Sequence, residues 1–387
     1  MKLSERLSSI APSMTLQITA KAKELKAKGE DVISFGAGEP DFDTPQYIKQ
    51  AAIDALNKGM TKYTVASGMV ELKEAIVAKF KNDNKIEYSA NQIIVSCGAK
   101  HSLFNAFQAI LNEGDEVIIP APYWLSYPEM VKCAGGVPIY LETKMENGFK
   151  LDVSDLKKAI TPRTKALIIN SPSNPTGGVY EEDELLEIAN VVKNYNIFVV
   201  SDEIYEKLVY DDFKFTSIAS LDDEIKKHTI TVNGLSKAYS MTGWRLGYLA
   251  CDANVAKVIA AYQSHSTSNP TSFAQYGGLA ALTQTDTSEI DAMRVSFEKR
   301  RNIMYDIISS MKKITAFKPT GAFYMFCDIS ATGMKAMEFA SKLLTEAKVA
   351  VIPGESFGSD KHIRLSFATS EKNIKNGLAR ISDWIGK

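Results

Sequence analysis

Short apolar runs and longer, more polar stretches alternate along the middle of the chain. Runs of about four to eight aliphatic and β-branched residues predict buried strands, and the stretches between them predict the helices that cover those strands. Alternation of this kind indicates an α/β architecture, with a mainly parallel sheet and helices on both faces. The predicted strands span 92–97, 116–120, 137–142, 165–170, 197–201, 229–233 and 246–251.

The N-terminal part predicts two helices around one short strand. A lysine-rich helix over 15–28 ends at Gly29, a residue typical of helix C-termini. A short strand follows over 32–35. Thr44 and Pro45 then form an N-cap and first-turn pair that opens a second helix.

Beyond residue 285 the alternation stops. A long charged helix over 293–313 is followed by a strand over 321–329, another helix, a strand over 362–367 and a final helix. This order of elements predicts a smaller α+β domain. At 387 residues the chain also exceeds the size of one ordinary hydrophobic core, so we expect two domains.

Composition narrows the functional classes. Hydrophobic residues make up 45% and charged residues 24% of the chain, and the net charge of −1 favours neither a nucleic acid nor a membrane surface as partner. The N-terminus lacks the apolar core of a secretory signal, and no stretch reaches the ~18 apolar residues that span a bilayer. The four cysteines show no ligand spacing, which indicates free thiols in a reducing cytosol rather than disulfides or a metal site. We therefore expect a cytoplasmic protein.

One lysine carries the strongest chemical signal. Lys237 follows an apolar strand and a turn at Asn233 and Gly234, so it lies at the carboxyl edge of the sheet, where α/β proteins place their active sites. Arg245 follows eight residues later and could hold a dianionic phosphate through a forked pair of hydrogen bonds. An amine that can form a Schiff base beside a phosphate clamp is what pyridoxal phosphate requires.

Two neighbouring strands end in polar segments that extend this pattern. The strand 197–201 leads into Asp202 and Tyr205, and the strand 165–170 leads into a loop rich in proline, asparagine and glycine. With other motifs in family order along nearly the whole chain, these segments resemble class I aminotransferases of the fold-type I pyridoxal-phosphate enzymes, most closely the bacterial aspartate aminotransferase subgroup. The motifs are GAGEPDFDTP (36–45), KYT (62–64), GAK (98–100), PYW (122–124), NPTG (174–177), SDEIY (201–205), GLSKAYSMTGWRLG (234–247) and HIRLSFATS (362–370).

The resemblance implies roles around the ring of pyridoxal 5'-phosphate. Lys237 would bind the cofactor covalently and then act as general base and acid at the substrate Cα. Asp202 would keep the ring nitrogen protonated, and Tyr205 and Asn174 would hydrogen-bond the phenolic oxygen. The alternatives are a helix N-cap for Asp202 and an ordinary turn residue ahead of Pro175 for Asn174.

The phosphate would lie where a strand gives way to a helix. Gly98 permits close approach, and Ala99 opens a helix whose free backbone N–H groups point at an anion. Family members often carry a serine three residues before the lysine, and this serine contacts the phosphate. Here that position is Gly234, so backbone groups or Arg245 must carry more of the binding.

The resemblance also implies substrate contacts. Arg364 would bind the α-carboxylate through its planar fork, with Asn174 beside it, and Gly38 would let the loop backbone approach the substrate. Trp124 would cover the cofactor ring and contact the substrate, unless it is ordinary core. Lys100 would bind the distal carboxylate of aspartate or glutamate, and the alternative is an exposed lysine at a helix start.

A homodimer with shared active sites is implied as well, in which Tyr63 reaches the phosphate of the neighbouring subunit. The resemblance divides the chain into a large cofactor-binding domain over 46–285 and a small domain, formed by 1–45 with 286–387, that closes over the active site. Arg294 and the arginines around it are interpreted as a solvated helix face rather than a second carboxylate clamp.

The predicted activity is ping-pong transfer of the amino group of aspartate to 2-oxoglutarate, which gives oxaloacetate and glutamate. Aromatic or prephenate aminotransfer stays open, because these substrates share the α-carboxylate clamp. A lyase on the same fold is a further alternative, against which Lys100 argues. A regulator with an N-terminal DNA-binding domain is not expected, because the GAGEP motif already begins at residue 36.

Overall fold

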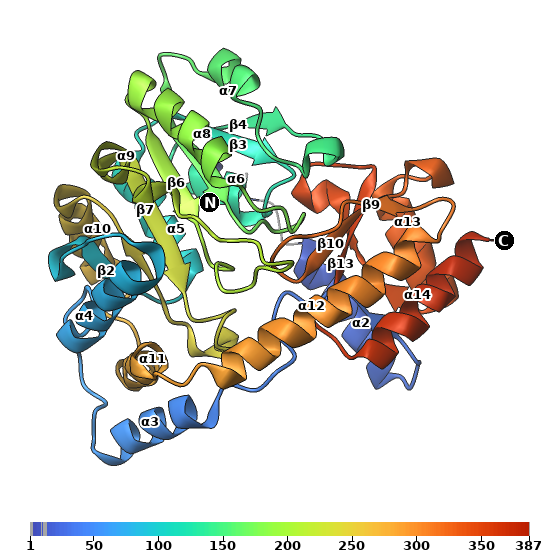
Figure 1. Ribbon diagram of the computed structural model, residues 1–387, viewed down its shortest axis with the longest axis horizontal. Helices are drawn as coiled ribbons and strands as arrows, with labels where there is room; N and C mark the ends of the chain where they lie inside the picture. The colour runs from blue at the N-terminus through green and yellow to red at the C-terminus, as the bar shows by residue number, and fades with distance from the viewer. Residues whose placement is uncertain (1–2, 9, 11–13, 387) are drawn as a thin grey trace.

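The computed structural model describes residues 3–8, 10 and 14–386. Its central sheet has seven strands, β2 (Ile93–Ser96), β3 (Glu116–Ala121), β4 (Val137–Glu142), β5 (Thr164–Asn170), β6 (Phe198–Asp202), β7 (Thr229–Gly234) and β8 (Gly247–Ala250). They lie in the order β2-β8-β7-β6-β5-β3-β4 (Figure 1). All neighbours are parallel except β8, which runs antiparallel to β2 and β7. The seven predicted strands and the mainly parallel sheet are confirmed.

Helices cover both faces of this sheet, because successive residues of a strand point to opposite sides. Val117 and Ile119 of β3 share a core with α5 (Ala99–Ile110), α6 (Ser126–Cys133) and α10 (Ala253–Ser266). Ile118 between them belongs to the core on the other face, with α7 (Val153–Ala159), α8 (Glu182–Tyr195) and α9 (Asp223–His228). The central strands are therefore apolar at nearly every position.

A third core covers the edge of the sheet at β2. It contains residues of α3 (Gln46–Asn57), α4 (Val70–Lys79) and α11 (Ser272–Thr283). The predicted start of α3 is confirmed, but the predicted N-cap is wrong, because the residue at the N-cap position is Pro45. The Thr44 hydroxyl instead donates to the carbonyl of Ser240 at 2.6 Å and accepts from Trp244 Nε1 at 3.1 Å. The Thr44 hydroxyl therefore makes tertiary contacts and does not cap α3.

The C-terminal part of the chain forms a second, α+β unit. Its four-stranded sheet is antiparallel and contains β12 (Ile352–Pro353), β13 (His362–Ser366), β10 (Tyr324–Asp328) and β9 (Thr315–Ala316) in that order. Its helices are α12 (Ser288–Ser309), α13 (Ala336–Lys342) and α14 (Glu371–Ile385). The long helix α12 extends from the neighbourhood of α11 across to this unit (Figure 1).

The N-terminal segment joins this second unit. Strand β1 (Ile33–Ser34) pairs in parallel with β11 (Val349–Ala350), and α2 (Met14–Ala27) contacts β11 and β12. A four-residue helix, α1 (Glu5–Ser8), precedes them. The domain boundaries at residues 46 and 286 stay a prediction. No helix in the described part of the chain is long and apolar enough to cross a membrane.

Candidate active site

A cavity of about 390 Å³ opens where β5 and β6 end and where the chain leaves β7. This volume is within the range of small-molecule sites. Ten of the residues predicted for the site line it: Gly38, Ala99, Lys100, Trp124, Asn174, Asp202, Tyr205, Lys237, Arg245 and Arg364. Gly98 does not line the cavity but adjoins Arg245, whereas Tyr63 is an exposed surface residue, 88% accessible, outside it.

Lys237 follows β7, as predicted. Its amine donates a hydrogen bond to the carbonyl of Gly38 at 2.5 Å and lies 5.9 Å from the ring of Tyr205. The cavity keeps the side chain partly accessible, but the surrounding protein desolvates the ammonium and lowers the pKa of Lys237 to about 8. The ammonium still predominates at pH 7, but the neutral amine is far more abundant than for an ordinary lysine, and the neutral amine is the form that acts as nucleophile or base.

Asp202 is the last residue of β6 and is 4% exposed. Tyr127 donates its hydroxyl to Oδ2 at 2.7 Å, and the backbone N–H of Ile204 donates to Oδ1 at 3.3 Å. Burial nevertheless raises the pKa of Asp202 to about 6. The chain turns after Asp202 without starting a helix, so the carboxylate does not cap one. A buried carboxylate of this kind suits a cationic partner inside the cavity.

Tyr205 stands beside a second tyrosine. Its hydroxyl lies 2.9 Å from that of Tyr324, and both side chains are buried. Burial raises the pKa of Tyr205 well above its usual value, with the Tyr324 hydroxyl adding to the rise. Tyr205 therefore remains a neutral phenol and keeps a proton to donate.

Arg364 comes from the middle of β13 and is 2% exposed. Its Nη1 donates to Asn174 Oδ1 at 2.9 Å, its Nη2 donates to the carbonyl of Gly36 at 3.3 Å, and its guanidinium carbon lies 4.3 Å from the ring centre of Tyr324. Its Nε is buried and has no hydrogen-bond partner among the described residues. A buried, unpaired donor on a positioned guanidinium is suited to an anion such as a carboxylate.

A second cationic corner surrounds the start of α5. Gly98 precedes α5 with φ +92°, and a Cβ on it would lie 2.6 Å from Arg245 Nη2, so glycine is required there. Arg245 is held by the carbonyl of Thr242, to which Nη1 donates at 2.8 Å. The first N–H groups of α5 have no acceptor within the helix. Together with Arg245 they can hold a phosphate.

Gly234, where the family often has serine, ends β7 opposite Gly247 of β8. A Cβ on Gly234 would lie 3.0 Å from the Gly247 Cα and 3.2 Å from Ile204 Cδ1. The local packing therefore favours glycine at this position. A different serine, Ser236, lines the cavity directly before Lys237.

Lys100 also lines the cavity. Its ammonium is 4.9 Å from the ring of Trp124, which itself packs edge-on against Tyr127 at 5.3 Å. No carboxylate in the described ranges pairs with Lys100, and burial, followed by the nearby Arg245, lowers its pKa. An anion in the cavity would give Lys100 a charged partner and would raise its pKa again.

Eight residues of the cavity lining were not predicted, among them Ser236, Thr242, Tyr127 and Tyr324. Ser236 and Thr242 lie inside the GLSKAYSMTGWRLG motif, so their nearness to Lys237 was a usable signal. Tyr127 lies in α6, three residues beyond Trp124, and its hydroxyl contacts Asp202 at the end of β6. Tyr324 comes from another sheet, and no spacing in the sequence connects it with Tyr205.

Comparisons with known proteins agree with this geometry. The family model described as aminotransferase class I and II matches residues 30–381. An aspartate aminotransferase of Bacillus sp. (strain YM-2) is 52% identical over 99% of both chains, and a probable aspartate/prephenate aminotransferase of Aquifex aeolicus (strain VF5) is 52% identical over 98% of this chain and 97% of that protein. The solved structure of Thermus thermophilus aspartate aminotransferase with maleate matches with a TM-score of 0.96 and 43% identity, over 99% of both chains.

Proposed function

The chain belongs to the class I and II aminotransferase family, and from that premise we propose that it transfers the amino group of aspartate to 2-oxoglutarate, giving oxaloacetate and glutamate in two half-reactions. One observation carries the proposal: Lys237, Arg364 and Lys100 line the same cavity. An amino acid with two carboxylates can pair with Arg364 and Lys100 while its amino end faces Lys237.

Pyridoxal 5'-phosphate fits the groups that the cavity offers. Burial raises the pKa of Asp202 more than its neighbours lower it. A protonated ring nitrogen beside this carboxylate would supply the positive charge that favours its ionised form. Tyr205 and Asn174 would hydrogen-bond the phenolic oxygen, and Lys237 would bind the cofactor covalently. When bound, the cofactor supplies an electron-accepting ring for the electron pair released as the substrate Cα–H bond breaks.

The phosphate would be held at the start of α5. Gly98 and Ala99 present backbone N–H groups there, and Arg245 reaches the same corner. Trp124 would cover the ring as a flat aromatic surface. These assignments use every charged and aromatic residue that the sequence predicted, except Tyr63.

The proton chemistry falls to Lys237. As a neutral amine it would take the proton from the substrate Cα, and the ammonium so formed would pass that proton to the cofactor within the same half-reaction. The second half-reaction would run the two transfers in reverse, so that Lys237 ends each half-reaction in the form in which it began. A pKa of about 8 lets both forms exist near neutral pH. Arg364 orients the α-carboxylate through its fork, and Asn174 keeps that fork in place.

An amino-donor screen with the purified holoenzyme and 2-oxoglutarate tests this function. We expect aspartate to be the fastest donor and oxaloacetate to appear in step with glutamate. Faster turnover of phenylalanine or tyrosine would favour an aromatic aminotransferase. Release of pyruvate and ammonia from sulfur amino acids would instead favour a lyase.

Prephenate is a second candidate acceptor, favoured by the name of the Aquifex aeolicus relative. Prephenate also carries two carboxylates, so the same pair of cations could bind it. With aspartate as donor, loss of prephenate at a rate comparable to that of 2-oxoglutarate would support this activity. No loss under those conditions would restrict the acceptor to 2-oxoglutarate.

The proposed assembly is a homodimer with shared sites. Tyr63 and Val65 are 88% and 57% exposed on the loop after α3, and Ile53 and Leu56 of α3 are 45% and 44% exposed. A second copy of the chain would cover this apolar surface and receive Tyr63 at its phosphate. Mixing inactive Tyr63→Ala and Lys237→Ala variants should restore part of the activity, since one hybrid site regains both groups. No recovery after verified subunit exchange would contradict shared sites.

We also propose a cytoplasmic location. All four cysteines are free thiols, and Cys251 and Cys327 are buried without a partner cysteine. Such thiols suit a reducing compartment. Cell fractionation with an antibody against the chain is the direct measurement.

A further inference from the structure

Two segments that meet in the active site are also joined outside it. Tyr205 lies just after β6 and Tyr324 begins β10, and their hydroxyls lie 2.9 Å apart. Nearby the same segments form an isolated antiparallel bridge between Val209 and Gly321. Backbone hydrogen bonds of 3.0 and 2.9 Å flank this bridge. The bridge and the tyrosine contact therefore join the same two segments.

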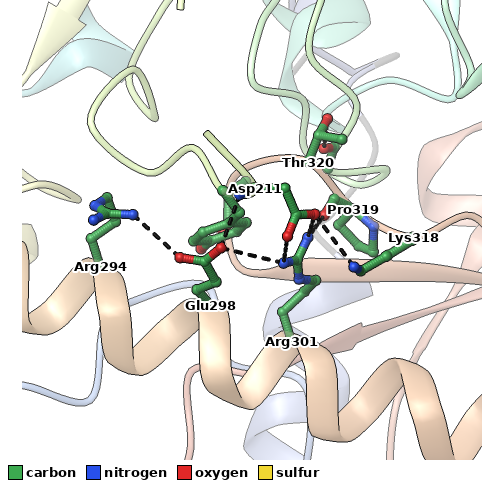
Figure 2. Close-up of polar contacts among 10 residues, drawn as sticks. Asp211, Arg294, Glu298, Arg301, Lys318, Pro319 and Thr320 are labelled. Atoms are coloured by element: carbon green, nitrogen blue, oxygen red, sulfur yellow. Dashed lines mark hydrogen bonds and ion pairs between the residues drawn. The ribbon is translucent and has the colours of Figure 1, made fainter. Parts of the chain in front are cut away.

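Helix α12 holds the bridge from outside. Figure 2 shows Arg301 of α12 directed at Asp211, and Nη1 and Nη2 donate to its two carboxylate oxygens at 2.6 and 2.8 Å. Nη1 also donates to the carbonyl of Pro319 at 2.8 Å. One turn earlier on the helix, Glu298 accepts the backbone N–H of Asp211 at 2.9 Å. Helix α12 therefore binds one segment at Asp211 and the other at Pro319.

The sequence predicts that Arg301 belongs to a solvated helix face, and for this residue the prediction is wrong. It is 0% exposed, and its guanidinium carbon lies 5.1 Å from the ring centre of Tyr210. The hydrogen bonds from Arg301 lower the pKa of Asp211, so the pair is ionic. A guanidinium buried this deeply needs a charged partner, because an unpaired buried charge is strongly unfavourable.

Asp211 is held in an unusual backbone conformation. Its φ is +55°, in the left-handed region that most residues avoid but that aspartate tolerates. Lys318, on the other segment, adds a second cation at 3.4 Å from its carboxylate. The carboxylate therefore connects α12 with both segments, and its position is fixed by backbone and side-chain contacts together.

We propose that Arg301 and Asp211 form a positioning pair for the active site, which sets the contact between the Tyr205 and Tyr324 hydroxyls. Neither residue lines the cavity, so the pair acts through the bridge. Tyr324 passes the effect on in two directions, to the phenol of Tyr205 and to the guanidinium of Arg364 above its ring. The inference rests on the proposed function for the cofactor that Tyr205 faces.

The test replaces Asp211 with asparagine, which keeps the size of the side chain and one acceptor oxygen but removes the charge. The matched control is Glu371→Gln, because Glu371 pairs with Lys299 of the same helix at 2.7 Å, where Lys299 is largely exposed. The first measurement is the absorbance of bound pyridoxal phosphate against pH, without substrate. Asp211→Asn should raise the pH at which the spectrum changes by about half a unit or more, since Tyr205 then donates less effectively, and Glu371→Gln should not.

The Tyr324→Phe background separates positioning from folding. With the Tyr324 hydroxyl removed, Asp211→Asn should produce no further spectral shift, because the group through which the pair acts is gone. An equal shift with and without that hydroxyl would overturn the proposal. A lower unfolding midpoint with an unchanged spectral transition would overturn it too, because the pair would then serve stability alone.

Two further measurements keep the outcome clear. Arg301→Lys retains a charge but loses the fork, so it should shift the spectrum in the same direction if Asp211→Asn does not fold. In the cofactor-free protein, amide hydrogen exchange at Tyr210 and Ala322 should accelerate at least about threefold in Asp211→Asn and stay unchanged in Glu371→Gln. Unchanged exchange would contradict the pair's hold on the bridge, whether or not the protein transaminates aspartate.

Discussion

Two cationic parts of the cavity lining, named the Arg364 end and the Lys100 end, are built in different ways. At one end Arg364 is buried, bonded to Asn174 and Gly36, and stacked on Tyr324. At the other end Lys100 is exposed, contacts only the face of Trp124 among the described aromatic rings, and has no carboxylate partner in the described ranges. Contacts within the chain position Arg364 and leave its Nε as a free donor among the described residues, whereas few contacts fix the position of Lys100.

This difference matches what each end must recognise. Every amino-acid substrate carries an α-carboxylate, so a rigid, bidentate arginine with a fixed surrounding serves all of them. Side chains differ between substrates, and a flexible lysine on an open wall can adapt to them at some cost in ordering. Under the proposed function, Arg364 would bind the common group, and Lys100 would decide between donors.

Loss of Lys237 should have the largest effect, because every donor would need its amine, whatever side chain the donor carries. Lys237→Ala should lower turnover of every donor by a factor on the order of 10² to 10⁴ or more, since the general base is gone. It should also abolish the borohydride-reducible bond between protein and pyridoxal phosphate, which mass spectrometry can detect. A reducible bond that persists in this variant would contradict the central assignment.

Loss of Arg364 should be the next largest effect and should not depend on the donor. Removing a buried, hydrogen-bonded guanidinium should lower kcat/KM by about two to three decades for aspartate and phenylalanine alike. Arg364→Lys should recover little, because an ammonium cannot replace the planar fork. If only aspartate were affected, the assignment of the two ends would have to be reversed.

Loss of Lys100 should be smaller and selective. A charged hydrogen bond contributes about 1.5 to 3 kcal/mol, so Lys100→Ala should lower kcat/KM for aspartate by about one to two decades. Phenylalanine and tyrosine have no distal charge and should lose far less. An equal loss for aspartate and phenylalanine would show that Lys100 supports the cofactor or the fold instead, and the contrast between the two ends would disappear.

The smallest effect concerns pH and the cofactor-free protein. Burial lowers the folded pKa of Lys237 to about 8, below the unfolded value of about 10.4, so the unfolded chain binds more protons between these two values. Stability should therefore rise with pH across this window, by at most about 1.4 kcal/mol per pH unit.

Chemical unfolding at pH 7.5 and 9.5 measures this rise. Most of the rise should be lost in Lys237→Met, which has no proton to lose at this position. The pKa of Lys100 is also lowered, by burial and then by Arg245, but Lys100 is the more exposed lysine. Lys100→Met should therefore remove less of the rise than Lys237→Met. The opposite order would mean that the Lys100 end is the more desolvated one.

Much of the site could be predicted because its residues follow strand ends. Asp202 and Lys237 each lie at or just after an apolar strand, and parallel strands bring such residues to one edge. The fold follows from the same alternation. Tyr324 could not be predicted in this way, since it reaches the site only through the pairing of β10 with β13 and the bridge to the segment after β6.

The wrong predictions share a cause. The Thr44 hydroxyl was expected to cap a helix, but it bonds to Ser240, which lies far along the chain. Arg301 was expected in solvent because its helix is rich in charge, yet Asp211 arrives from another segment and makes burial possible. In both cases a partner far away in the sequence determines the contacts of a side chain, although the local sequence predicts a different environment for it.

The pairing of β1 with β11 has a consequence for how the protein is made. The large sheet, complete at β8, can form while the chain is still being synthesised, but β1 leaves the ribosome early and its partner strand is made near the end. Gly36 and Gly38, which follow β1, must wait with it before their carbonyls meet Arg364 and Lys237. Under the proposed function, most of the residues for the cofactor would therefore be in place before Gly36 meets Arg364, and β1 would stay unpaired until β11 is made.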